Sequence, residues 1–322
     1  MASYLVTGGA GFIGSHLTEE LVRRGHSVRV ADSLITGNRR NLDHIRDVEF
    51  IRGDLADMTI AARAVAGMDY VLRQAAIPSV PRSVGDPIES NHANVTATWN
   101  VLVAARDTGV KRLVFASSSA EYGNAPESPK REDMPTSPLT PYALQKVAGT
   151  EYCRMFTSLY GFETVATRYF NVFGPRQDPG SPYSGVISLF ATALFEGRRP
   201  IIYGDGEQTR DFTYVANIVD GVLRACEAPK APGEVINVAT GDSVSLNELL
   251  RVMNRSVGTD LQPIYKEARQ GDVKDSQADI TKAKRLLGYT PSVSLEEGLR
   301  HTLAWCRGEG PAPPDAAVVS AG

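Results

Sequence analysis

Cysteine is scarce in this chain of 322 residues: Cys153, Cys226 and Cys306 are the whole complement. They are widely spaced, form no C-x-x-C pair and are odd in number, so at least one of them cannot be paired within the chain. This pattern excludes the disulfide framework of a small secreted domain, and it is typical of reduced thiols in a cytoplasmic protein.

Long apolar runs, an excess of one charge and clustered histidines are lacking too. No run is long enough to span a bilayer, and the N-terminus has no basic stretch followed by an apolar one. A net charge of -3 at pH 7 provides no basic field for nucleic acid or anionic membrane. The five histidines show no metal-ligand spacing. We therefore expect a cytoplasmic protein with no metal, nucleic-acid or membrane partner.

Glycine, by contrast, is concentrated near the start, in Gly8-Gly9-Ala10-Gly11-Phe12-Ile13-Gly14. This segment follows a short strand pattern, Tyr4-Leu5-Val6, and precedes a helical pattern that begins at Ser15. A strand, a glycine turn and a helix N-terminus in this order form the pyrophosphate site of dinucleotide-binding proteins. Asp32 ends the next strand pattern, where an acid can bind the adenosine ribose. These features predict a nicotinamide dinucleotide as cofactor.

Strand and helix patterns alternate along much of the chain, which predicts an α/β fold with a Rossmann-type, doubly wound parallel sheet. Strands are expected near 3–7, 27–32, 48–52, 69–73, 111–116, 163–168 and 234–238. Further helices are expected at 59–66, 94–107, 141–160, 245–257, 279–287 and 294–306.

The predicted domain division follows from these patterns. Residues 1–170 are expected to form the NAD-binding domain, to which 211–240 return. Residues 171–210 and 241–307 are expected to form a smaller C-terminal α/β domain for the substrate. The Pro/Ala/Gly-rich segment 308–322 is predicted to be a disordered tail.

Tyr142 and Lys146 lie four residues apart on the clearest predicted helix, so both face the same side. A free tyrosine has a pKa of about 10 and is a poor base at neutral pH. A nearby ammonium favours the phenolate. Ser117-Ser118-Ser119 follow the fifth predicted strand, at the sheet edge where doubly wound folds keep their active sites. A serine hydroxyl there can join the substrate oxygen to Tyr142, although three serines can also be a plain polar loop.

Together these motifs resemble the extended short-chain dehydrogenase/reductases, and within them the UDP-hexose 4-epimerase family. The branch of bacterial UDP-N-acetylglucosamine 4-epimerases matches best. The resemblance runs from residue 3 to about residue 306. It rests on the motifs above and on Gly53-Asp54-Leu55, Gln74-Ala75-Ala76, Ser79-Val80-Pro81-Arg82-Ser83, Arg168-Tyr169-Phe170-Asn171-Val172-Phe173-Gly174-Pro175-Arg176, Gly204 to Phe212, and Arg269-Gln270-Gly271-Asp272-Val273.

The resemblance implies three sets of functional residues. Ser118, Tyr142 and Lys146 would be catalytic. NAD would be bound by Gly8, Gly11, Phe12, Ile13, Asp32, Leu34, Thr36, Gly37, Asp54, Leu55, Gln74, Ala75, Ala76, Asn94, Tyr142, Lys146 and Tyr169. The nucleotide sugar would be bound by Ser79, Ser118, Ser119, Asn171, Val186, Tyr203, Arg210, Arg269, Asp272 and Ser276. Asp32 would repel a 2′-phosphate and so favour NAD over NADP, while Arg39 and Arg40 keep NADP as an alternative.

Some positions depart from the family pattern. Arg73 stands where a histidine is expected, and Ser243 stands where close relatives carry an arginine. Ser119 and Ala120 occupy the places where the dehydratases have their acid pair. Glu121, one residue further on, is expected to point to the other side.

An epimerase needs no such acid pair. By the family pattern, Tyr142 takes the C4 hydroxyl proton while hydride passes to NAD⁺, and the 4-keto sugar turns before hydride returns to its opposite face. We therefore predict an isomerase, a 4-epimerase of UDP-GlcNAc/UDP-GalNAc and of UDP-Glc/UDP-Gal. Ser276 is small enough to leave room for an N-acetyl group. A UDP-glucuronate 4-epimerase, another UDP-sugar-modifying relative and a non-catalytic NAD-binding sensor or scaffold stay as alternatives. A homodimer formed by 94–107 and 141–160 is expected.

Overall fold

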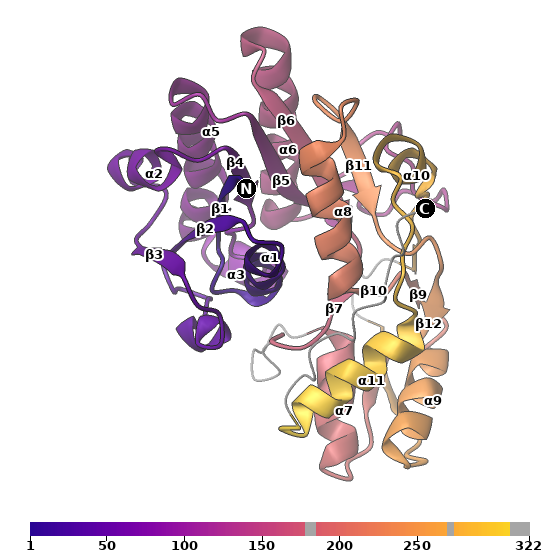
Figure 1. The fold of residues 1–322 in the computed structure, drawn as a ribbon. Coiled ribbons are helices and arrows are strands. Elements are labelled where there is room, and N and C mark those ends of the chain that lie inside the picture. Colours follow the sequence, from indigo (N-terminus) through magenta and orange to yellow (C-terminus); the bar gives the residue numbers. More distant parts are fainter. Residues whose placement is uncertain (178–184, 269–273, 310–322) are drawn as a thin grey trace, which may run out of the picture.

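The computed structural model describes residues 1–177, 185–268 and 274–309. Seven parallel strands form the centre of its larger part, in the order β11-β6-β5-β4-β1-β2-β3 (Figure 1). Their bounds are β1 (Ser3–Thr7), β2 (Ser27–Asp32), β3 (Val48–Arg52), β4 (Tyr70–Arg73), β5 (Arg112–Ser118), β6 (Glu163–Tyr169) and β11 (Val235–Val238). The predicted Rossmann-type fold class is confirmed.

Helices cover both faces of this sheet, because its strands are apolar on both sides. One core lies under α1 (Phe12–Arg23), α8 (Val215–Glu227) and α10 (Thr281–Leu287). The other lies under α2 (Met58–Val65), α5 (Ala97–Asp107) and α6 (Pro141–Tyr160). The carboxyl ends of the strands therefore open between two helical layers.

Helix α6 has the capping that its sequence predicts. The Thr140 side chain accepts a hydrogen bond from the Ala143 N–H at 3.2 Å, Pro141 is the first helical residue, and Gly161 ends the helix in the left-handed conformation. Short segments lead into α5: α3 (Val80–Gly85), α4 (Pro87–Asn91) and the π-helical turn η2 (His92–Thr96). The 3-10 turns η1 (Arg39–Leu42) and η3 (Ser119–Tyr122) follow β2 and β5.

The smaller part, at the bottom of Figure 1, packs α7 (Val186–Phe195), α9 (Leu246–Val257) and α11 (Leu295–Cys306) around a third core. Its strands are short: β8 (Ile201–Tyr203) pairs with β13 (Ile264–Lys266), and β9 (Thr209–Arg210) lies between β12 (Val244–Ser245) and β14 (Asp275–Ser276). At the junction, β7 (Val172–Phe173) pairs with β10 (Thr213–Tyr214). The division into two domains stays a proposal, and α10, which the sequence assigned to the smaller domain, packs on the large sheet.

Helices α7 and α8 are not predicted from the sequence. Val186–Phe195 is apolar along nearly its whole length, so it lacks the alternation of polar and apolar faces that marks a surface helix. The α8 sequence contains Ile218, Val219 and Gly221, which have low helix propensity, and tertiary packing against β5 and β6 overrides it.

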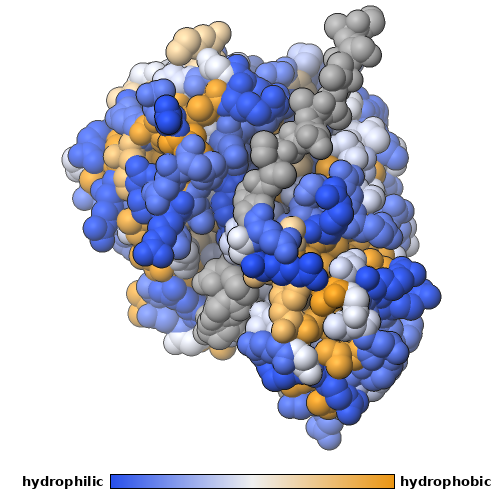
Figure 2. Space-filling model, turned by 60° about the horizontal axis from the view of Figure 1, so that its bottom comes forward, coloured by the Kyte–Doolittle hydropathy of each residue, from blue (hydrophilic) through white to orange (hydrophobic). Residues whose placement is uncertain are grey.

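The surface and the thiols add further observations. In the described part of the chain, no helix is long and apolar enough to cross a membrane. Figure 2 shows a largely hydrophilic face on which hydrophobic residues form small groups. All three cysteines are free thiols, with Cys153 and Cys226 buried. The predicted tail lies almost entirely outside the described residues.

Candidate active site

A cavity of about 1180 Å³ opens at the carboxyl ends of β1, β2, β4, β5 and β6. The smaller part of the molecule contributes to its wall as well. The cavity brings together most of the residues predicted from sequence: Gly8, Gly11, Phe12, Ile13, Asp32, Thr36, Gly37, Asp54, Leu55, Gln74, Ala75, Ala76, Ser79, Ser118, Ser119, Tyr142, Lys146, Tyr169, Asn171, Arg210 and Ser276.

The glycine turn is shaped for a close backbone approach. Gly8 has φ +68, and a Cβ at Gly14 would lie 2.1 Å from the Gly8 carbonyl oxygen, so only glycine allows α1 to start this near to β1. Helix α1 begins immediately after Gly11 with no side-chain cap and no acidic residue in its first turn. Its first N–H groups are thus available to a phosphate at the positive end of the helix dipole.

Asp32 is held in place by two backbone donors. Its carboxylate accepts hydrogen bonds from the Ala10 N–H at 3.0 Å and from the Leu34 N–H at 2.8 Å. Burial raises the pKa of Asp32 above its ordinary value, and these two N–H groups act in the opposite direction. Leu34 itself has φ 63 and packs against the core, so it lies behind the cavity wall and orients Asp32 through its backbone.

The segment after β4 forms the opposite wall. Gln74 accepts a hydrogen bond from the Tyr169 hydroxyl at 3.1 Å, while its buried side-chain nitrogen has no partner in the structure. Asn94 is buried behind this segment, where it accepts from the Ile77 N–H at 2.8 Å and donates to Gln145 at 2.8 Å. Asn94 therefore braces the wall rather than lining it.

These features fit NAD. The open helix N-terminus suits a pyrophosphate, the fixed carboxylate of Asp32 suits a ribose diol, and Gln74, which lines the same cavity, has a buried side-chain nitrogen without a partner. Gly8, Gly11, Phe12 and Ile13 would hold the pyrophosphate.

Ser118, Tyr142 and Lys146 share one wall of the cavity. Ser118 is the last residue of β5 and caps the turn η3, accepting from the Ala120 N–H at 3.2 Å. Tyr142 and Lys146 lie one turn apart on α6, with the Lys146 ammonium nitrogen 5.8 Å from the centre of the tyrosine ring. That ammonium donates a hydrogen bond to the Ala116 carbonyl at 2.7 Å.

Burial dominates the titration of both groups on α6. It raises the pKa of Tyr142 to about 12, although a hydrogen bond with Ser118 acts in the opposite direction. Burial also lowers the pKa of Lys146 to about 7, and the nearby Arg73 guanidinium adds to this effect. The attraction between ammonium and phenolate that the sequence suggested therefore competes with a strong cost of burying charge.

Arg73, the departure from the family pattern, is 1% exposed and lies behind the wall. It donates to the Ala75 carbonyl, and to the Ala93 carbonyl at 3.2 Å, and its Nε has no partner. Burial lowers its pKa to about 10. Ser243, the other departure, is exposed just before β12.

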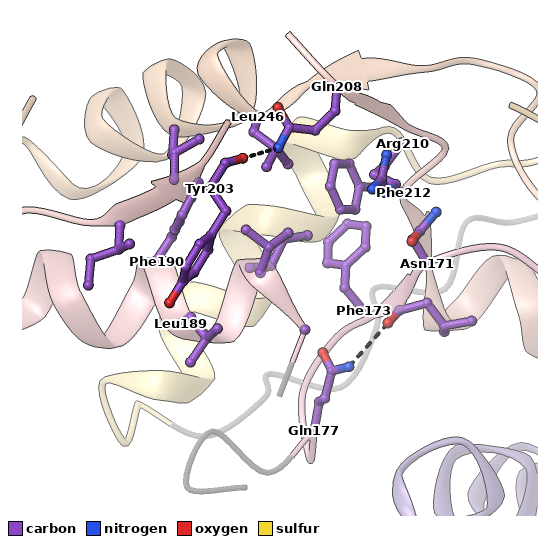
Figure 3. A pocket seen from close by; sticks show the side chains of 16 residues that line it. Asn171, Phe173, Gln177, Leu189, Phe190, Tyr203, Gln208, Arg210, Phe212 and Leu246 are labelled. Atoms are coloured by element: carbon purple, nitrogen blue, oxygen red, sulfur yellow. Dashed lines mark hydrogen bonds between the residues drawn. The ribbon is translucent and has the colours of Figure 1, made fainter. Parts of the chain in front are cut away.

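A second cavity of about 280 Å³ adjoins the first in the smaller part of the molecule (Figure 3). Val186 and Tyr203 line this cavity, whereas Asn171 and Arg210 line both cavities. Arg269 and Asp272 lie outside the described residues.

Sequence reasoning missed several lining residues of the large cavity. They are Arg82, Lys130, Arg176, Gln177 and Trp305. Arg176 and Gln177 stand in the Asn171–Arg176 motif or next to it, so that motif was a usable signal. Lys130 and Trp305 carry no local signal, since only the folding of the chain brings them to the cavity.

Comparison with known proteins identifies the family. Residues 4–239 match the model of the NAD dependent epimerase/dehydratase family. The chain belongs to this family. The match confirms the predicted resemblance.

Relatives similar over nearly the whole chain act on different sugars. A UDP-glucose 4-epimerase of Mycolicibacterium smegmatis is 39% identical, over 94% of this chain and 98% of its own length. The structure of a UDP-N-acetylglucosamine 4-epimerase from Methanobrevibacter ruminantium M1, in complex with UDP-N-acetylmuramic acid, is 38% identical with a TM-score of 0.91, and 96% of this chain and 99% of that one are covered. The structure of a UDP-glucuronic acid 4-epimerase variant from Bacillus cereus, in complex with NAD and a fluorinated UDP-glucuronic acid, is 31% identical with a TM-score of 0.88, covering 96% and 100%.

These findings confirm that the chain is an enzyme, that its class is isomerase and that its cofactor is NAD.

Proposed function

We propose that the protein is a UDP-sugar 4-epimerase that interconverts UDP-N-acetylglucosamine and UDP-N-acetylgalactosamine, with UDP-glucose and UDP-galactose as co-substrates. One observation carries the choice of reaction. Among the described residues that line the large cavity, the carboxylates are Asp32 and Asp54, which come from the cofactor-binding segments. Dehydration and decarboxylation in this family use an acid beside the catalytic serine, whereas here Ser119 and Ala120 stand there.

The residues on the cavity wall match the needs of epimerisation. When bound, the cofactor would supply a hydride acceptor as NAD⁺ and a hydride donor as NADH, and its oxidised form would add a positive charge that favours the phenolate. Tyr142 takes the proton from the C4 hydroxyl and later returns it. Ser118 donates a hydrogen bond that stabilises the phenolate, and Lys146 adds positive charge on the same face of α6.

The nucleotide is proposed to extend from the large cavity into the smaller one. Asn171 and Arg210 line both cavities, so they are placed to contact a diphosphate that crosses between them. Beyond them the smaller cavity is walled by Phe190, Tyr203 and Phe212, which offer flat apolar surfaces to a base (Figure 3).

The sugar pair is proposed from Ser276. In β14 this residue pairs with Arg210 of β9 and lines the large cavity together with Tyr122 and Gly123. Its short side chain leaves space for an N-acetyl group at C2.

The test is an NMR time course of the purified protein, without added cofactor, on UDP-GlcNAc, UDP-Glc and UDP-glucuronate separately. We expect the 4-epimers of the first two sugars and retention of some NAD through purification. Turnover confined to UDP-glucuronate would favour the alternative epimerase. Required consumption of added NADH would indicate a reductase, and no turnover of any sugar would favour an NAD-binding sensor or scaffold.

We also propose a homodimer formed by α5 and α6. Trp99 on α5 and Leu144 and Leu159 on α6 are exposed large hydrophobic residues, at 37%, 58% and 66%. Helices from two copies could bury them in a four-helix bundle. Sedimentation equilibrium tests this, and a monomer at micromolar concentration would contradict it.

A further inference from the structure

Glu121 is a buried carboxylate for which the epimerase mechanism has no use so far. It lies in the turn η3, is 0% exposed, and points away from the cavity that its neighbours Ser119 and Ala120 line. It forms an ion pair with Arg168 of β6, which is itself 3% exposed. The distance from the carboxylate to the Arg168 Nη2 is 2.7 Å, and the distance to Nε is 2.8 Å.

The same carboxylate connects the two elements that carry the catalytic residues. It accepts hydrogen bonds from the Ser117 hydroxyl and, at 2.7 Å, from the Thr150 hydroxyl. Ser117 precedes Ser118 at the end of β5, and Thr150 lies one helical turn beyond Lys146 on α6. We call Ser117, Glu121, Thr150 and Arg168 the Glu121 network.

The charge of Glu121 is also felt at the active site. It acts to raise the pKa of both Tyr142 and Lys146. The other ionisable groups around it are Arg73 on β4, which acts on Lys146 in the opposite direction, Cys153 on α6, Tyr122 on η3, and Arg168 on β6. Inside a protein these charges act strongly because little water screens them.

Building on the proposed function, we propose that Glu121 is a positioning residue of the reaction: its carboxylate holds Ser118 on β5 in register with Tyr142 on α6, and it places a buried negative charge on the same side of the active site as Lys146. The geometry carries the positioning role, because the two oxygens of one carboxylate bond to β5, α6 and β6. Arg168 pairs with the second oxygen and so fixes the orientation of the carboxylate.

Three variants separate charge from position. Glu121→Gln keeps the shape but leaves the Arg168 guanidinium buried without a counter-charge. Glu121→Gln/Arg168→Gln removes both charges, which also guards against a variant that fails to fold around an orphaned cation. Thr150→Val keeps the charge and the side-chain shape but removes the hydroxyl by which α6 bonds to Glu121.

One readout does not depend on activity: the titration of Lys146 in the NAD-bound protein. NMR of isotope-labelled lysine measures it, and the Lys146→Arg variant identifies the Lys146 signal. In Glu121→Gln we expect the Lys146 midpoint to fall by about one pH unit, the scale of losing a nearby opposite charge, and to stay lowered in the double variant, which lacks the same charge. Thr150→Val should leave the midpoint unchanged.

Turnover gives the second readout. Glu121→Gln and Thr150→Val should both lower kcat roughly tenfold with little change in KM, the size of effect expected when proton transfer is misaligned. Glu163→Gln is the matched control, since Glu163 pairs with Arg112 at the opposite end of the same two strands. It should change neither the kcat nor the Lys146 midpoint.

Two results would overturn the inference. One is an unmoved Lys146 midpoint in both Glu121 variants, which would reduce the network to packing. The other is full kcat in Thr150→Val, which would remove the positioning role. A protein that epimerises no UDP-sugar but shows the expected Lys146 shift would instead contradict the proposed function and leave the electrostatic role of Glu121 standing.

Discussion

The proposed cofactor half and the proposed sugar half of the large cavity are built in different ways. The cofactor half takes its wall from short segments directly after β1, β2 and β4, and neighbouring parallel strands bring these segments together. The proposed sugar half takes Asn171, Arg210 and Ser276 from three distant segments, which meet through the short β7–β10 and β9–β14 pairings and through bonds to Asp211. The first half therefore depends on local motifs, and the second depends on long-range packing.

This difference teaches where substitutions should act. A change in the cofactor half should affect every substrate alike, because all of them need NAD. A change in the sugar half should separate one substrate from another. The catalytic wall lies between the two halves, and a change there should stop the chemistry without disturbing either binding site.

The largest effect is expected at the catalytic wall. Tyr142→Phe removes only the oxygen that carries the proton, so kcat should fall by about two to four orders of magnitude, the usual scale for a lost acid/base. Turnover is measured by NMR, and NAD binding and the unfolding temperature serve as controls that should stay unchanged. Near-normal turnover would show that another group carries the proton.

The next largest effect should be a difference in turnover between the N-acetylated and the other UDP-sugars. Ser276→Tyr fills space in the large cavity at Ser276, so turnover of UDP-GlcNAc and UDP-GalNAc should fall roughly a hundredfold, as expected from overpacking by a few kcal/mol, while UDP-Glc and UDP-Gal are spared. Ser276→Ala is the control and should leave both pairs unaffected. Equal losses on both pairs would mean that the tyrosine disrupts β14 in general.

A smaller effect is expected on the affinity for NAD. Asp32→Asn replaces a carboxylate that accepts two backbone N–H bonds, so the Kd for NAD should rise roughly tenfold. Calorimetry on protein stripped of cofactor measures this, with the exposed Asp43→Asn as control. An unchanged Kd would remove Asp32 from the ribose site, and a loss confined to one sugar would contradict the division into two halves.

The smallest effect is expected on stability at low pH, through His16. This residue of α1 contacts Pro175 and Arg176, which follow β7. Its Nε2 lies 3.0 Å from the Pro175 carbonyl and its Nδ1 lies 2.7 Å from Arg176, so Nε2 carries the proton and Nδ1 accepts. Burial lowers the pKa of His16 from its ordinary 6.5 to about 3, and Arg176 adds to this.

In the folded protein His16 stays neutral between pH 6.5 and about pH 3, whereas in the unfolded chain it is protonated below about pH 6.5. Stability should be complete above pH 6.5 and fall toward pH 3, by at most about 1.4 kcal/mol per pH unit. His16→Gln should flatten this slope in urea unfolding measured across that range, while the exposed His92→Gln should not. Identical slopes in all three proteins would show that other groups control the acid side.

The sequence by itself was sufficient for the elements and the local motifs of the cofactor half. Thr140, Pro141 and Gly161 mark the ends of α6 because capping is a matter of neighbouring residues. The spacing of Tyr142 and Lys146 places both on one face for the same reason. The glycine turn and Asp32 could be predicted because each lies within a few residues of a strand end.

Only the tertiary structure decided the rest. Asn94 and Leu34 are predicted at the cofactor, and the structure adds what the sequence could not show: Asn94 accepts from the Ile77 N–H, and the Leu34 N–H donates to Asp32. The sequence predicts that Glu121 points to the other side of the strand, but it does not identify the partners of Glu121. Thr150 and Arg168 become its neighbours only when α6 and β6 pack beside β5. The pKa of Lys146 could not be predicted from the sequence either, since it depends on burial and on the buried Arg73 of β4. Local order follows from contacts a few residues apart, whereas burial, charge and the shape of the sugar site follow from contacts between segments that are far apart in the chain.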